Sequence, residues 1–278
     1  MDTVASKLEL TLLPGARKLL EVHARELPQR DDLCGAFCGS LALHAAGLSE
    51  RGGEPLDQDA VARAAGSFVS RVADTSALPA GEHGRRDYRI PPPLIDDASV
   101  SGTNCAGVLQ AVQELSDERL CALPYVGPWS GAALAGLFDA VAALERPATL
   151  IANVATRHLW GSAPSTSQLL DLLLDGADDG PPADWDVGHF VCVFGRIGGP
   201  GGELYGVADT YPALGVGGVH VQPGERLARA LARPDMAPGG MIAVVAREDA
   251  ASVRAAADAC GLQERAWDNG TLTVTPDA

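Results

Sequence analysis

Three residues of reactive type, Cys34, His189 and Asp209, stand in sequence contexts that suit a thiol enzyme. Cys34 opens an apolar helical run, where the positive end of the helix dipole favours a thiolate. An imidazole facing that thiol could take its proton, and a carboxylate behind the imidazole would fix its tautomer and steady the imidazolium. His189 begins a strand rich in Val and Phe, and Asp209 lies on the strand that follows. The three residues therefore predict a nucleophilic Cys-His-Asp site.

A second thiol, Cys38, lies one helical turn after Cys34, so a metal site and a redox pair have to be weighed as well. A zinc site needs about four closely spaced ligands, and His44 falls on a different face of the helix. A redox pair favours two intervening residues rather than three. We therefore expect no metal and no redox pair. Cys38 packs under Cys34, or it is itself the nucleophile one turn further on, or both thiols are small buried residues.

Four more residues are candidates for the same site. Gln29 precedes Cys34 by five residues, and its side-chain amide could hold an oxyanion together with backbone N–H groups at the start of the helix. We expect His158, Trp160 and Trp185 to line the substrate cleft, because they fall near a strand end or shortly before the strand of the catalytic histidine.

Each assignment has a structural alternative. His189 could be a strand histidine with satisfied hydrogen bonds, Asp209 could start a turn, and the aromatic residues could belong to the core. The segment from Asp171 to Asp186 concentrates six carboxylates. It is either a solvated loop or an acidic rim that prefers a cationic substrate.

Periodicity, caps and turn residues predict the elements that would position the site. Helices come first along the chain and mostly antiparallel strands follow, which is typical of an α+β fold. A long loop over 76–102 has no periodicity, and long loops of this kind are often functional or mobile. The predicted helices cover 15–26, 33–46, 57–73, 103–116, 130–145, 224–233 and 249–261, and the predicted strands cover 148–155, 188–197, 204–212, 217–223 and 239–247.

These elements suggest one main domain over 1–247, with a helical part over about 15–146 and a sheet part over about 147–247. An appendage over 248–278 is predicted to hold a helix and then a hairpin around Asn269-Gly270.

Composition limits the class of protein. Among 278 residues, 46% are hydrophobic and the net charge is −15, so the chain can bury a core but would repel nucleic acid and anionic membranes. There is no 18-residue apolar window for a membrane span, and the N-terminus lacks the features of a signal peptide. We therefore expect a cytoplasmic protein with neither nucleic-acid nor membrane partners; nothing in the sequence indicates an oligomeric state.

The order of these motifs resembles the papain-like cysteine peptidases, and within them the bacteriocin leader peptidases of the double-glycine family. The matching pieces are Gln29, "LCGAFCGSLAL" at 33–43, "RPATLIANV" at 146–154, "GHFVCVFG" at 188–195 and "VADTYP" at 207–212. The resemblance covers roughly residues 25–247.

The resemblance implies a papain-like fold and a cofactor-free enzyme that works through a thioacyl-enzyme. Cys34 would be the nucleophile, His189 the base and then the acid, and Asp209 the residue that orients the histidine, with Gln29 in the oxyanion hole. The implied reaction is hydrolysis of a peptide or amide bond. The alternatives are acyl or aminoacyl transfer or cyclisation in bacterial natural-product biosynthesis, with a free or carrier-bound substrate, and an inactive papain-like domain that binds a peptide or a carrier protein.

Overall fold

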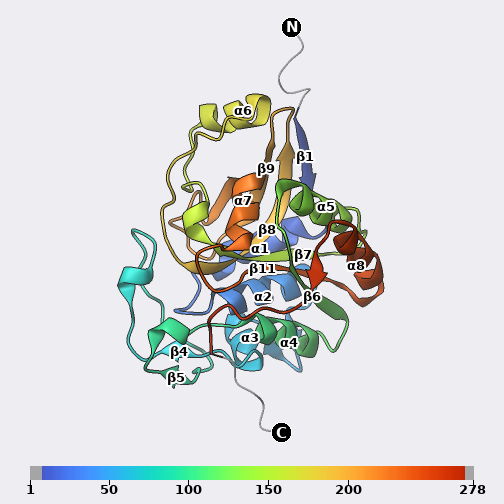
Figure 1. The fold of residues 1–278 in the computed structure, drawn as a ribbon. Helices are drawn as coiled ribbons and strands as arrows, with labels where there is room; N and C mark the ends of the chain where they lie inside the picture. Colours follow the sequence, from blue (N-terminus) through green and yellow to red (C-terminus); the bar gives the residue numbers. More distant parts are fainter. Residues whose placement is uncertain (1–7, 273–278) are drawn as a thin grey trace.

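An antiparallel sheet forms the middle layer of the protein in a computed structural model, which describes residues 8–272 (Figure 1). Within these residues the sheet has eight strands. Seven of them lie in the order β10-β9-β8-β7-β11-β6-β12, and the eighth, β1, pairs with the C-terminal end of β8. Its strands are β1 (Glu9–Leu12), β6 (Leu120–Val126), β7 (Thr149–Ala155), β8 (Gly188–Gly198), β9 (Glu203–Ala208), β10 (Val219–Pro223), β11 (Gly240–Ala246) and β12 (Gln263–Glu264).

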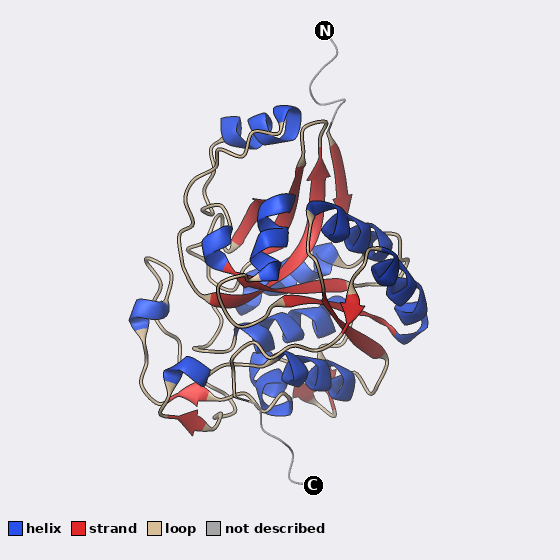
Figure 2. Ribbon diagram, in the orientation of Figure 1, coloured by secondary structure: helices blue, strands red, loops and turns tan. Residues whose placement is uncertain are grey.

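Helices cover both faces of the sheet, as Figure 2 shows. Successive residues of a strand point to opposite faces, so Ile151 packs into the cluster with α1 to α4, whereas Leu150 packs into the cluster with α5, α7 and α8. The helices are α1 (Ala16–Glu26), α2 (Cys34–Ala45), α3 (Gln58–Ala64), α4 (Cys105–Leu115), α5 (Gly131–Ala142), α6 (Thr166–Asp175), α7 (Gly224–Ala232) and α8 (Ala250–Ala259).

Helix α2 is buried along almost its whole length, between the sheet and α3 and α4. Its apolar residues leave no polar face, which is typical of a helix enclosed on all sides. A Cβ atom on Gly35 would lie 3.0 Å from Thr103 and 3.3 Å from Phe190. The missing side chain therefore lets the first turn of α2 approach β8 closely, at the end of the strand where His189 lies.

The predicted α+β class is confirmed, and so are most of the predicted helices and strands. The helix expected over 57–73 is shorter, because Gly66 takes a positive φ of 64° after α3 and the chain then forms the strand β4 (Val69–Ser70). Asp209 comes directly after β9 rather than within it. The expected helical part also supplies the strand β6 to the sheet, and β1 comes from the segment before that part.

Three further segments are a short hairpin, a long loop and the C-terminal appendage. A short hairpin joins β2 (Glu50–Arg51) and β3 (Glu54–Pro55), and the long loop after α3 contains β5 (Leu94–Ile95), which pairs with β4. The appendage begins with α8 and continues with β12, which extends the sheet beside β6; most of the second arm of the expected hairpin lies outside the described residues. Between residues 8 and 272, no helix is long and apolar enough to cross a membrane.

Candidate active site

Cys34 is the first residue of α2 and lines a cleft of about 450 Å³. The preceding residue, Leu33, provides no side-chain cap, so N–H groups of the first helical turn lack a side-chain acceptor. Cys38, in contrast, is fully buried, and burial together with the neighbouring Cys192 thiol raises its pKa well above the usual value. The cleft therefore exposes one thiol of the pair, at a helix start that favours negative charge.

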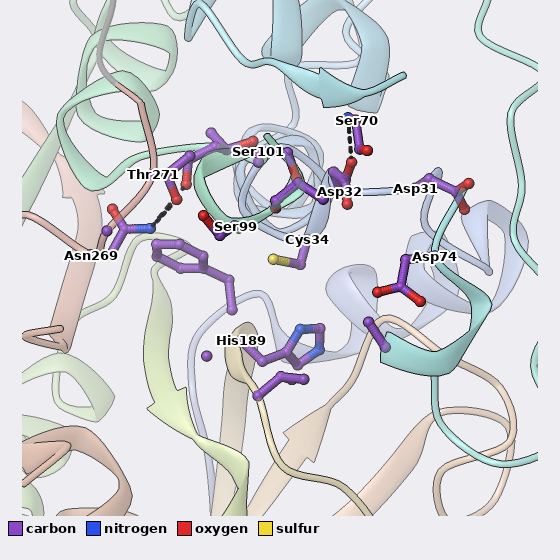
Figure 3. Close-up of a pocket in the computed structure, with 18 of the residues that line it drawn as sticks. Asp31, Asp32, Cys34, Ser70, Asp74, Ser99, Ser101, His189, Asn269 and Thr271 are labelled. Carbon is purple, nitrogen blue, oxygen red and sulfur yellow. Dashed lines mark hydrogen bonds between the residues drawn. The ribbon is translucent and has the colours of Figure 1, made fainter. Parts of the chain in front are cut away.

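His189 lies beside this thiol, and its ring is held from behind by Asp209. The Asp209 Oδ1 atom accepts a hydrogen bond from His189 Nε2 at 3.0 Å, and Thr210 Oγ1 lies 3.1 Å from the same nitrogen. Because Nε2 is engaged there, Nδ1 is the ring nitrogen left for Cys34. Figure 3 shows Cys34 and His189 in the same cavity.

His189 and Asp209 are both buried, and each shifts the pKa of the other. Burial alone would lower the pKa of His189, but the Asp209 charge and hydrogen bond and a hydrogen bond with Cys34 raise it to about 10. Burial alone would raise the pKa of Asp209, but the charge and hydrogen bond of His189, together with the hydrogen bond from His220, hold it below its usual value. An imidazolium next to a carboxylate is therefore the favoured form at neutral pH.

A second histidine, His220, stands behind the carboxylate. Its Nε2 lies 3.2 Å from Asp209 Oδ2, and its Nδ1 lies 3.1 Å from Gln222 Nε2. Gln222 is oriented by the backbone of Trp160, which donates its N–H to Oε1 at 2.7 Å and accepts from Nε2 at 3.0 Å. Because the Gln222 amide nitrogen can only donate, His220 Nδ1 has to accept, and its proton sits on Nε2, facing Asp209.

Aromatic side chains enclose the His189 ring. The Trp185 ring meets it edge to face with centroids 4.7 Å apart, and the Tyr211 ring stacks on it at 6.2 Å. The Trp185 indole N–H donates to the carbonyl of Ala77 at 2.9 Å, which joins the long loop to the site. Trp185 therefore lines the cleft, as the sequence suggests, and contacts the imidazole directly.

Gln29 is buried, lines the same cleft, and makes no side-chain hydrogen bond to the residues of the described chain. Its backbone N–H donates to the carbonyl of Thr210 at 3.0 Å, which ties it to the strand end that carries Asp209. The structure thus brings Cys34, His189, Asp209 and Gln29 together, although up to 180 residues separate them in the sequence.

The other two candidates for the cleft lie elsewhere. His158 is buried at the end of β7 with its Nε2 3.4 Å from Asp235, outside the cleft lining. The Trp160 indole packs with Leu172 and Leu204 and donates to Asp178, so it faces the small core beside α6. Trp160 contributes to the site only through its backbone. None of the carboxylates between residues 171 and 186 lines the cleft either.

The walls of the cleft come from distant parts of the chain. In Figure 3, Asp31 and Asp74 lie on one side of Cys34, and Asn269 and Thr271 lie on the opposite side. The long loop supplies further lining residues, and the segment after β12 closes the cleft from the other direction. Within residues 8–272, no three His, Cys, Asp or Glu side chains are grouped so that they could hold a metal ion.

Sequence reasoning missed several residues of this site: His220, Gln222, Tyr211 and Arg233. The sequence did indicate two of them. The segment "VHVQP" places His220 and Gln222 on one face of the next strand after Asp209. The buried Arg233 follows a helix, and nothing in its local sequence distinguishes it from the surface arginines of that helix.

Comparison with known proteins places the chain in a family. No curated protein matches it. The sequence model of DUF6885, described as a family of unknown function, matches residues 13–268, which include Gln29, Cys34, His189 and Asp209. The chain therefore belongs to the DUF6885 family.

Proposed function

We propose that this protein is a papain-like thiol enzyme that hydrolyses a peptide or amide bond through a thioacyl-enzyme. The observation that carries the proposal is the meeting of Cys34, at an uncapped helix start, with a His189 ring held by the buried Asp209 carboxylate. A nucleophile, a base and an orienting group in this order are the parts that nucleophilic catalysis requires.

In the first half of the reaction, the Cys34 thiolate would attack the carbonyl carbon, and the electrons of the C=O bond would move to the oxygen. The Gln29 amide and backbone N–H groups of the first turn of α2 would hold that oxyanion. The proton on His189 Nδ1 would pass to the leaving nitrogen as the C–N bond breaks. The products of this half are a free amine and a thioester on Cys34.

In the second half, water would give a proton to His189 Nδ1 and attack the thioester carbon. Collapse of the tetrahedral intermediate would release a carboxylic acid and restore the thiolate. If an amine replaced water, the same thioester would transfer its acyl group, so product analysis separates hydrolysis from acyl transfer or cyclisation.

Alkylation of the thiol tests the proposal without knowledge of the substrate. At pH 6 an ordinary cysteine is almost entirely protonated, so iodoacetamide should label Cys34 at least about tenfold faster than it labels glutathione. Peptide mass spectrometry would locate the label. Cys38→Ala should keep the fast reaction, and Cys34→Ala should abolish it. Labelling of Cys34 no faster than glutathione would refute the enzyme assignment.

A further inference from the structure

Arg233 is a buried cation in the same cleft as Cys34. It follows α7 with a left-handed backbone (φ 45°), and only 5% of the residue is exposed. Its guanidinium lies against the backbone just before His189, since a Cβ atom on Gly188 would come within 2.5 Å of Arg233 Nη2. The absence of a side chain at Gly188 thus makes room for a cation next to the catalytic histidine.

The guanidinium has no carboxylate partner among residues 8–272. Its Nη1 donates to the neutral amide oxygen of Asn153, which also accepts from the Trp267 indole N–H at 3.2 Å. Arg233 Nε is buried without any partner, and Nη2 makes no hydrogen bond in the described chain. Arg30 differs in this respect, because it is similarly buried but lies 3.3 Å from the Asp59 carboxylate.

Burying a cation without a counter-charge costs free energy. Burial lowers the pKa of Arg233 to about 10, although the Cys34 charge partly opposes the shift, so the side chain is still protonated at neutral pH. The unpaired edge, Nε and Nη2, is the edge with which arginine binds a carboxylate through two parallel hydrogen bonds. The protein therefore presents an incomplete ion pair beside its reactive thiol.

The rest of the cleft is polarised in a way that would orient an anion. Asp31 and Asp74 lie on one wall (Figure 3), where Arg86 Nε lies 3.9 Å from Asp31 Oδ2 and leaves the Asp74 carboxylate as the less compensated charge. Arg233 shares the Asn153 oxygen with Trp267, which belongs to the C-terminal segment that forms the opposite wall. Repulsion from the carboxylates and attraction to Arg233 would direct a negative group toward the second wall.

We propose that Arg233 binds a carboxylate of the substrate, positioned next to the carbonyl that Cys34 attacks. The inference rests on the proposed function and narrows its substrate class to peptides or amides that carry an acid group within a few bonds of the scissile carbonyl. Arg233 would then act as a specificity residue, with Asn153 holding the guanidinium in place.

Two alkylating reagents of nearly equal size test this inference, because iodoacetate carries a carboxylate and iodoacetamide does not. In both reactions the Cys34 sulfur forms a bond to carbon and iodide leaves. Arg233→Gln should lower the ratio of the iodoacetate rate to the iodoacetamide rate by about tenfold, as expected for the loss of one nearby charge. Arg233→Lys should retain part of that preference. Arg86→Gln removes a charge from the same cleft but should leave the ratio unchanged.

A competition measurement on the unaltered protein covers the case in which Arg233→Gln does not fold. Succinate should slow labelling by iodoacetamide, whereas succinamide at the same concentration should not. Fast iodoacetamide labelling with an unchanged ratio in Arg233→Gln, or equal effects of the two competitors, would overturn the role of Arg233 alone. Slow iodoacetamide labelling of Cys34 would overturn the enzyme assignment and this inference with it.

Discussion

At the scale of single residues, the site depends on one carboxylate that serves two imidazoles. Asp209 accepts from His189 through one oxygen and from His220 through the other. His220 lies behind Asp209, and its other ring nitrogen is engaged by Gln222 at 3.1 Å. We interpret His220 as a positioning residue, which keeps the Asp209 oxygens turned so that one of them faces His189.

Replacement of His220 by leucine should cost stability, because it leaves one oxygen of a buried carboxylate without a donor. A loss of about 1–3 kcal/mol in the free energy of unfolding is expected, measured by urea denaturation at pH 7. The iodoacetamide reaction of Cys34 should slow as well, since the orientation of His189 is no longer fixed.

His44→Leu is a matched control for this replacement. His44 is also buried, but its Nε2 has no hydrogen-bond partner in the described chain and it lies away from the cleft. His44→Leu should lose less stability than His220→Leu, and iodoacetamide should label its Cys34 at the wild-type rate. Equal behaviour of the two variants would contradict a positioning role for His220.

At the scale of the elements, close packing of α2 against β8 sets the distance between the Cys34 thiol and the His189 ring. Gly35→Ala gains about 1 kcal/mol of helix propensity but introduces contacts of 3.0 and 3.3 Å to Thr103 and Phe190, and such overpacking costs about 1–3 kcal/mol. The start of α2 should shift away from β8, so labelling of Cys34 by iodoacetamide should slow at least about threefold.

Gly39→Ala separates the effect on position from the effect on stability. A Cβ atom there would meet the Val61 side chain at 2.9 Å, one helical turn after Gly35 and further from Cys34. This variant should change the urea midpoint to a similar extent without changing the labelling rate. If both variants slowed labelling equally, the packing of Gly35 would have no special role in placing the thiol.

The elements that the sequence predicted well are those with explicit end signals. Ser130 and Asn104 cap α5 and α4 through their side chains, at or next to the first residues of the helices predicted over 130–145 and 103–116. Helix α6 carries a comparable signal, the capping box of Ser165 and Gln168, which was overlooked beside the acidic residues that follow. Strand β6 could not be recognised locally, because its pairing with β11 and β12 supplies the stability that Pro124 and its neighbours do not indicate.

The sequence likewise predicted some residues of the site and missed others. Cys34, His189 and Asp209 stand at element ends, where reactive types in short motifs can be read from the sequence. Arg233 and Tyr211 enter the site through tertiary packing alone, and Trp160 was misplaced because its indole turns toward Leu172 while only its backbone serves the site.

At the scale of the whole molecule, the charged pair in the cleft should shape the pH dependence of folding. The pKa of His189 is raised to about 10 in the folded protein, so its contribution to stability is complete below about pH 6.5 and is lost as the pH rises toward 10. The pKa of Asp209 is lowered, so its contribution is present above about pH 4 and is lost on acidification.

Comparison of the wild type with His189→Gln tests this expectation. The difference in the free energy of unfolding between the two proteins should be largest between about pH 4 and 6.5 and should shrink toward pH 10, with a slope of at most about 1.4 kcal/mol per pH unit for one proton. Urea denaturation at a series of pH values measures it. A difference that does not vary between pH 6 and 10 would show that His189 is not an imidazolium in the folded protein.

The Gln222 side chain forms hydrogen bonds with the main chain of Trp160, and this has a consequence for how relatives of this protein can diverge. Since Trp160 orients Gln222 through its peptide N–H and C=O groups, the proton arrangement behind Asp209 does not depend on which side chain occupies position 160. Positions 220 and 222 have no such freedom, because each supplies a specific donor or acceptor to the other. Across the family, we expect these two positions to change together and position 160 to drift with the small core around Leu172 and Leu204.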